Sequence, residues 1–365
     1  MNASRAERLA AAVADRDLDA LIVGDLVRPG DSGADAIANI RWLTGFTGTS
    51  GLALVGPEER TFLTDFRYTE RAAYEVAGEF ERVTIEGRLV VELAKRLRGR
   101  VGFDDVATSV HWQRRLETEI GDDVELVPAG GMVEELRRTK DADEIAAIAE
   151  ASRLADEVFE WIAERGLAGR TERGVALAAE GRMRELGAEP SFPAIVAAGP
   201  NGARPHAEPG AREIGPAELV VIDMGAKLHG YCSDGTRTFA SGEVGADERE
   251  VYDLVLTAQL ASLEAVRPGV GGAEADAVSR EPIAAAGHGD HYGHGLGHGV
   301  GLEVHEAPRL GKTSEDRLAV GDVVTVEPGV YLPGRFGVRI EDLVVVAEEG
   351  TRNLSSTPKE LRVVG

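Results

Sequence analysis

Three short runs in the second half of the chain, mostly apolar, each end in an acidic residue. They are residues 220–222 before Asp223, 323–326 before Glu327, and 338–340 before Glu341. Runs of this kind predict buried strands, and a carboxylate that ends a buried strand is costly unless a partner compensates its charge. Arginine or backbone N–H groups could satisfy any one of these acids, but three of them together favour a shared cation.

Two further side chains complete a ligand set. Asp234 lies in the segment Ser233-Asp234-Gly235, and His298 lies in the glycine-rich segment 287–301. Four carboxylates and one imidazole suit two hard or borderline divalent cations better than a tetrahedral zinc. Two such cations can hold a water between them and lower its pKa, which makes a hydroxide nucleophile near neutral pH. The spacing therefore fits a two-metal hydrolase.

The charge balance limits the partners. The chain has 63 Asp and Glu against 40 Lys and Arg, a net charge of −23 spread along its length. Such a surface repels nucleic acid and anionic membranes. Only five of the bases are lysine, a composition that resembles proteins of salt-loving organisms, in which screening makes self-repulsion tolerable.

Several features point to the cytoplasm. Cys232 is the only cysteine, so no intrachain disulfide can form. No apolar run approaches the roughly 18 residues of a membrane span, and the N-terminus lacks a signal-peptide pattern. We therefore expect a cytoplasmic protein without a membrane partner.

The length of 365 residues favours two domains. Strand patterns alternate with helical ones in the first part, which predicts an α/β domain over residues 1–139. The composition changes near residue 140, where Asp141 or Asp143 could cap a long helix. From residue 218 the pattern becomes strand, turn, strand, and the glycine-rich segment is not a regular helix. We place the second domain at residues 140–365.

The motifs of the second domain resemble those of the pita-bread metallopeptidases, most of all the Xaa-Pro branch of aminopeptidase P and Xaa-Pro dipeptidase (prolidase). They are Asp-x-Gly at 223–225, Ser-Asp-x-Thr-Arg-Thr at 233–238, the histidine-glycine motif at 294–306, Glu-Pro-Gly at 327–329 and Arg-x-Glu-Asp at 339–342. Residues 42–46 and 64–68 resemble the creatinase-type N-terminal domain of this family. The resemblance implies an α/β creatinase-type domain followed by an α+β pita-bread catalytic domain.

The resemblance also implies roles for the ligands. Asp223 would bind one metal, Asp234 and Glu341 would bridge both, and His298 and Glu327 would complete the second. Glu327 would also shuttle the proton of the bridging water, since a ligand carboxylate lies in hydrogen-bond reach of it.

Four more side chains receive roles by the same resemblance. His305 would hold the scissile carbonyl oxygen, and His206 would contact the substrate and the tetrahedral intermediate. His294 and Arg339 would line the pocket for proline and its carboxylate.

The implied activity is hydrolysis of the bond before proline by a homodimer that uses two divalent metal ions, most readily manganese or cobalt. A metal-independent creatinase-like hydrolase and a non-catalytic binding protein on the same fold are alternatives, which the intact ligand set disfavours. Methionine aminopeptidase is disfavoured because it lacks the N-terminal domain. The choice between dipeptidase and aminopeptidase stays open.

Overall fold

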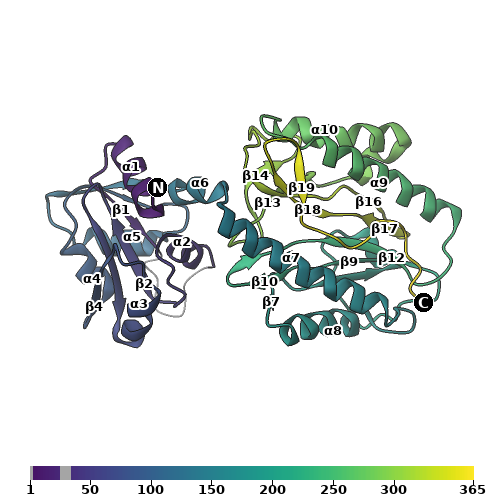
Figure 1. Cartoon of the computed structure of the whole chain (residues 1–365), viewed down its shortest axis with the longest axis horizontal. Helices are drawn as coiled ribbons and strands as arrows, with labels where there is room; N and C mark the ends of the chain where they lie inside the picture. Colours follow the sequence, from purple (N-terminus) through teal and green to yellow (C-terminus); the bar gives the residue numbers. More distant parts are fainter. Residues whose placement is uncertain (1–2, 25–33) are drawn as a thin grey trace. The chain divides into compact units, whose positions relative to one another are not determined.

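The computed structural model describes residues 3–24 and 34–365. The chain divides into two compact units, Met1–Arg137 and Arg138–Gly365. Figure 1 colours both units along the sequence, and each is described here by itself.

The first unit is built on one mixed sheet of six strands in the order β4-β3-β2-β1-β5-β6. Strand β1 pairs antiparallel with β2 and parallel with β5, so the sheet combines both kinds of ladder. The strands are β1 (Ala20–Val23), β2 (Gly51–Val55), β3 (Arg60–Asp65), β4 (Glu81–Ile85), β5 (Gly99–Phe103) and β6 (Val124–Pro128). The helices are α1 (Arg5–Asp15), α2 (Ala34–Thr44), α3 (Thr69–Glu75), α4 (Leu89–Ala94), α5 (Val110–Glu117) and α6 (Met132–Arg138). This is the α/β arrangement that the sequence predicts.

The second unit packs strands between two pairs of helices, with α7 and α8 on one side and α9 and α10 on the other (Figure 1). The helices are α7 (Ala142–Ala163), α8 (Glu172–Glu185), α9 (Ala246–Ala265) and α10 (Gly272–Ile283). The first group of strands comprises β7 (Glu189–Pro190), β8 (Ile195–Ala198), β9 (Leu219–Asp223), β10 (Ala226–Leu228), β11 (Tyr231–Cys232) and β12 (Thr236–Ala240). The second comprises β13 (Gly297–Gly299), β14 (Glu306–Leu310), β15 (Val323–Val326), β16 (Gly329–Leu332), β17 (Phe336–Arg339), β18 (Asp342–Val346) and β19 (Thr351–Asn353).

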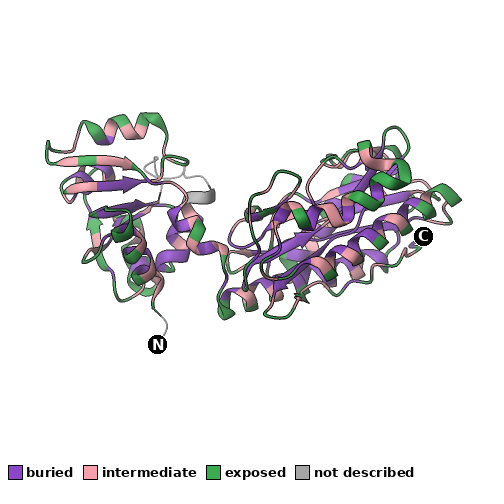
Figure 2. Ribbon diagram, turned by 90° about the horizontal axis from the view of Figure 1, so that it is seen from above, coloured by how far each residue is buried: buried purple, intermediate pink, exposed green. Residues whose placement is uncertain are grey.

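The core of this unit has a layer on each side of the strands. Val158 of α7, Met183 of α8 and Ile222 of β9 belong to one buried apolar cluster, whereas Val255 of α9 and Val338 of β17 belong to another. Figure 2 shows the strands almost wholly buried and the outer helix faces exposed. Strands covered on both faces read as continuous apolar runs, which explains why the runs before the three acids were visible in the sequence.

Helix α7 begins as the sequence suggests. Asp141 is its N-cap and accepts a hydrogen bond from the backbone N–H of Glu144 at 2.9 Å, while the Glu144 carboxylate accepts from the Asp141 N–H at 3.0 Å. This reciprocal capping box fixes the start of the helix and decides between Asp141 and Asp143.

The glycine-rich segment 287–301 was expected not to form a regular helix, and it contains the short strand β13. A side chain on Gly297 would place its Cβ 2.1 Å from the carbonyl oxygen of Thr325, so glycine is what allows the two backbones to approach. In the described part of the chain, no helix is both long enough and apolar enough to cross a membrane.

Candidate metal centre and active site

Strand register brings the first two candidate ligands together. Strands β9 and β12 are antiparallel, and Asp223 at the end of β9 lies opposite Thr236 at the start of β12. Asp234 lies two residues before the start of β12 and is buried. Both carboxylates therefore lie at the same end of this strand pair.

The other three candidate ligands come from the second group of strands. Glu327 lies between β15 and β16, Glu341 lies between β17 and β18, and His298 is the middle residue of β13. The hydroxyl of Thr325 accepts a hydrogen bond from the His298 N–H at 3.1 Å and donates to Glu327 Oε1 at 3.2 Å. This hydroxyl ties one ligand's backbone to the other ligand's carboxylate.

The five candidate ligands line one pocket of about 980 Å³. Ligand atoms of Asp234, His298 and Glu341 all lie within 4.8 Å of one another. His298 Nε2 lies 3.6 Å from Asp234 Oδ2 and 3.3 Å from Glu327 Oε1. The structure thus brings the predicted set together.

Two observations fit a cation in this pocket. Asp223 Oδ1 is buried and finds no hydrogen-bond partner among the described residues, and a buried acceptor left unsatisfied is costly. His298 Nδ1 lies 3.1 Å from the carbonyl oxygen of Gly299, which can only accept. The proton on Nδ1 is therefore fixed by this contact, and Nε2 is the nitrogen left to bind a metal.

The charged groups in the pocket shift one another's pKa values. Burial and the nearby Glu341 and Asp223 raise the pKa of Asp234 well above its usual range, and burial with Glu327 and Asp223 does the same to Glu341. Burial opposes the ionisation of Glu327, but the hydrogen bond and charge of His298 prevail and lower its pKa to about 2. Burial also disfavours charged His298, yet Glu327 raises its pKa.

His294 is held by protein atoms on both ring nitrogens. Nδ1 lies 2.8 Å from the carbonyl oxygen of Gly295 and so carries the proton. Nε2 then accepts from the hydroxyl of Tyr331 at 2.8 Å, and that hydroxyl accepts from Arg339 Nη1 at 2.8 Å. The ring is a fixed wall of the pocket. Tyr331 was missed by the sequence reasoning, and a tyrosine four residues after Glu327 was the only signal.

Arg339 is 3% exposed, and its guanidinium donates hydrogen bonds to several protein groups. Besides Tyr331, it donates to Asp223 Oδ2 through Nη2 and to the Thr236 hydroxyl through Nε, the latter at 3.0 Å. The Thr236 hydroxyl in turn donates to Glu341 Oε2 at 2.6 Å. Arg339 lines the pocket as predicted, but its direct contacts are with a candidate ligand and with groups that hold the others.

His305 and His206 also line the pocket, and both are exposed. The ring of His305 lies 4.4 Å from that of His298, centroid to centroid. Burial and the positive charge of His298 lower the pKa of His305. A neutral His305 can donate one N–H to an oxygen in the pocket.

Comparison with known protein families identifies the family of this chain. The sequence model of a protein family, described as metallopeptidase family M24, matches residues 146–348 of this chain. The chain belongs to this family. The model of the creatinase/prolidase N-terminal domain matches residues 5–139, so the predicted combination of a creatinase-type domain with a pita-bread catalytic domain is confirmed.

Individual relatives of this M24 chain cover nearly its whole length. An uncharacterized peptidase of Bacillus subtilis, YqhT, is 42% identical over 331 residues, 89% of this chain and 93% of the relative. The structure of an Xaa-Pro dipeptidase from Bacillus anthracis has a TM-score of 0.92 at 37% identity and covers 98% of this chain and 99% of that one. An X-Pro aminopeptidase from Thermotoga maritima has a TM-score of 0.89 at 33% identity, with coverage of 99% and 100%. The prediction of a metallopeptidase is confirmed.

We predict that Mn²⁺ binding to the metal-free protein expels protons and tightens as pH rises. Asp234 and Glu341 have raised pKa values, so they hold protons until the pH exceeds those values, and a cation binds only their ionised forms. Calorimetric titrations in two buffers of different ionisation enthalpy count the protons released. Glu341→Gln should release fewer protons than the unmodified protein. Affinity that is equal at pH 6 and pH 8, with no proton release, would contradict the prediction.

Proposed function

We propose that this M24 metallopeptidase hydrolyses the peptide bond before proline. The observation that carries the proposal is the cluster of Asp234, His298 and Glu341 in one pocket with His305. The Xaa-Pro dipeptidase and X-Pro aminopeptidase that share its fold support proline as the specificity. The bond before proline lacks an N–H, so a protease that recognises extended substrate through this group cannot use it there.

Charge favours two divalent cations over one. When ionised, the four candidate ligand carboxylates and the adjacent Arg339 guanidinium together carry three negative charges. One divalent cation would leave a negative charge facing the substrate carbonyl, whereas two reverse the sign. Oxygen-rich ligands with one imidazole suit manganese or cobalt. Bound there, such cations supply Lewis acidity and a water of lowered pKa.

We assign the residues of the chain as follows. Asp223, Asp234, His298, Glu327 and Glu341 hold the cations. Glu327 accepts the proton of the attacking water, because a ligand carboxylate lies within hydrogen-bond reach of it. His305 and His206 face the substrate, whose carbonyl oxygen gains charge during attack. His294 and Arg339 form the wall beside the proline ring.

We predict that His305→Ala lowers kcat by roughly 10²–10³ with little change in KM, the usual effect of removing one donor to a developing oxyanion. Metal content should stay unchanged, because His305 is not assigned as a ligand. Steady-state kinetics with metal analysis measures both. His288→Ala is the matched control, since this histidine is absent from the pocket lining. An unaltered kcat, or loss of metal, would refute the role of His305.

Among proline-directed activities, we propose dipeptidase first. The pocket wall carries Arg309 and Lys312, for which no ion pair is found among the described residues. Both side chains are exposed, and a cation there can receive the terminal carboxylate of an Xaa-Pro dipeptide. The Thermotoga relative keeps aminopeptidase action on Xaa-Pro-Yaa as the second candidate.

A substrate panel separates these two candidates. We expect faster hydrolysis of Xaa-Pro than of Xaa-Pro-Yaa, and Arg309→Ala should raise KM for the dipeptide by about tenfold, the worth of roughly 1.4 kcal/mol. Amidation of the dipeptide should produce a similar loss in the unmodified enzyme and none in the variant. Preference for the tripeptide, with no effect of Arg309→Ala, would favour the aminopeptidase.

We also propose a homodimer that associates through the first unit. Phe66 and Tyr74 of this unit are 80% and 82% exposed, and burying them in an interface would remove their apolar surface from water, which is favourable. Light scattering should give twice the mass of 38.7 kDa, and Phe66→Ser with Tyr74→Ser should shift it toward the monomer. A monomeric, fully active enzyme would reject the dimer.

The same samples in molar potassium chloride should melt at higher temperature if the acidic composition is an adaptation to salt.

A further inference from the structure

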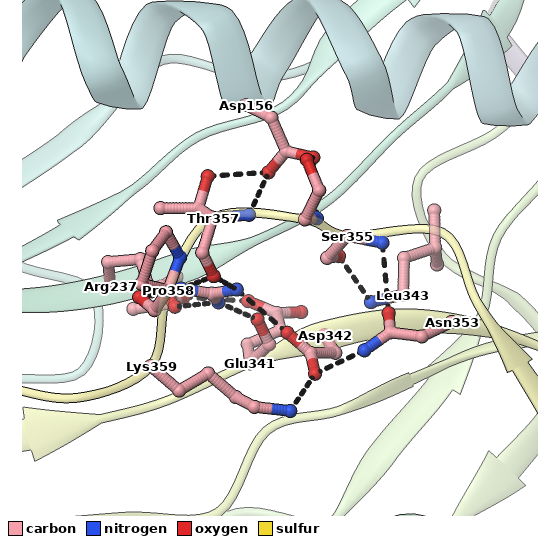
Figure 3. Close-up of polar contacts among 12 residues, drawn as sticks. Asp156, Arg237, Glu341, Asp342, Leu343, Asn353, Ser355, Thr357, Pro358 and Lys359 are labelled. Atoms are coloured by element: carbon pink, nitrogen blue, oxygen red, sulfur yellow. Dashed lines mark hydrogen bonds and ion pairs between the residues drawn. The ribbon is translucent and has the colours of Figure 1, made fainter.

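Behind the candidate ligand Glu341 lies the buried ion pair of Asp342 with Arg237, joined by the partly exposed Lys359 (Figure 3). Asp342 is fully buried and accepts from Arg237 Nη2 at 2.8 Å, from Lys359 Nζ at 2.6 Å and from Asn353 Nδ2 at 2.7 Å. Burial opposes the charge of Asp342, but Arg237 and Lys359 prevail and lower its pKa. This network contributes no group to the pocket lining.

The network reaches Glu341 through the backbone. Asp342 is the next residue in the chain, and Arg237 Nη1 donates to the carbonyl oxygen of Glu341. The same nitrogen donates to the carbonyl of Thr236 at 2.9 Å, and the hydroxyl of Thr236 donates to the Glu341 carboxylate at 2.6 Å. Arg237 therefore holds the backbone of Thr236 and of Glu341 next to the Thr236 hydroxyl, which donates to the Glu341 carboxylate.

The C-terminal segment closes the network from the other side. Arg237 donates to the carbonyl of Thr357 from Nη2 at 2.6 Å and to that of Pro358 from Nε at 3.2 Å. Asp156 of helix α7 holds the same segment, accepting from the Ser356 N–H at 2.7 Å and from the Thr357 hydroxyl at 2.6 Å. Figure 3 shows the segment between the helix and Arg237.

Glu341 needs such support because its neighbours repel it. Its carboxylate lies among Asp223, Asp234 and Glu327, and in the ionised form that a cation requires it is repelled by these acids. Side chains that orient a metal ligand from behind typically contribute 10- to 100-fold to metal affinity. A buried network of this kind works only if every member is satisfied.

We propose that residues 353–359, acting through Asp342 and Arg237, are a positioning element that fixes Glu341 for cation binding. The inference rests on the proposed ligand role of Glu341. Lys359, Asn353 and Asp342 are positioning residues in this scheme, since none of them lines the pocket.

The test removes the ammonium group of Lys359, which lies outside the pocket, and leaves the residues that line the pocket unchanged. Lys359→Met should weaken Mn²⁺ binding to the metal-free protein by about tenfold in calorimetry, and excess Mn²⁺ should restore kcat. Lys359→Arg, which keeps the charge, should bind Mn²⁺ nearly as the unmodified protein does. Arg362→Met is the matched control: Arg362 lies three residues after this segment and pairs with Glu160 of the same helix at 2.6 Å, and it is not among the residues that donate to Asp342. It should alter melting temperature only.

The outcomes are distinct. Weakened Mn²⁺ binding in Lys359→Met but not in Arg362→Met, at similar melting temperatures of the metal-free proteins, supports the positioning role. Equal Mn²⁺ affinity in the two variants overturns it. If Lys359→Met does not fold, Asn353→Ala removes one hydrogen bond from the same carboxylate and decides the question. Failure of the unmodified protein to bind Mn²⁺ would instead overturn the proposed function, which separates the two claims.

Discussion

The repulsion among four carboxylates in one pocket is the constraint on which the catalytic unit is built. Asp223, Asp234, Glu327 and Glu341 approach one another where little water can screen them. The protein compensates in part, with one guanidinium, one imidazole and several hydroxyl groups, and it leaves Asp223 Oδ1 unsatisfied. Buried charge compensated only in part destabilises a fold. Cations that bind only the native state raise its free energy of unfolding by mass action. Metal binding and folding of this unit are therefore coupled.

The fold meets this constraint by placing ligands at strand ends, and not on long loops. Asp223 ends β9 and Glu327 follows β15, so packed strands set the position of each carboxylate. The strand that bears His298 fits beside Thr325 only because its first residue, Gly297, has no side chain. Sites on regular elements hold geometry more tightly than sites on loops. The rigidity that allows like charges to stay together therefore comes from the sheets.

The sequence revealed the ligands better than it revealed what holds them. Apolar runs that end in acids are a local pattern, and so is the cap at Asp141. The hydroxyls of Thr236 and Thr325 and the contact of Arg339 with Asp223 depend on strand register, which no local pattern encodes. Helix α10 lies in a segment for which the sequence led to no prediction; Gly272 and the internal Pro282 disfavour a helix, and packing against α9 stabilises it. The direct contacts of Arg339 likewise depend on register, since its partners Asp223 and Thr236 come from β9 and β12.

The beginning of the catalytic unit is itself part of the site's support. Lys140 Nζ lies 3.1 Å from Glu306 Oε2, and both side chains are buried, at 1% and 7% exposure. Glu306 also accepts from the N–H of Glu303 at 3.0 Å, so the turn that carries His305 is fastened at both ends. Arg138 adds an ion pair to the fully buried Asp322 at 3.2 Å. Within this unit, Lys140 is therefore bound to the segment that presents His305, and we expect a change of Lys140 to act on the geometry of the active site.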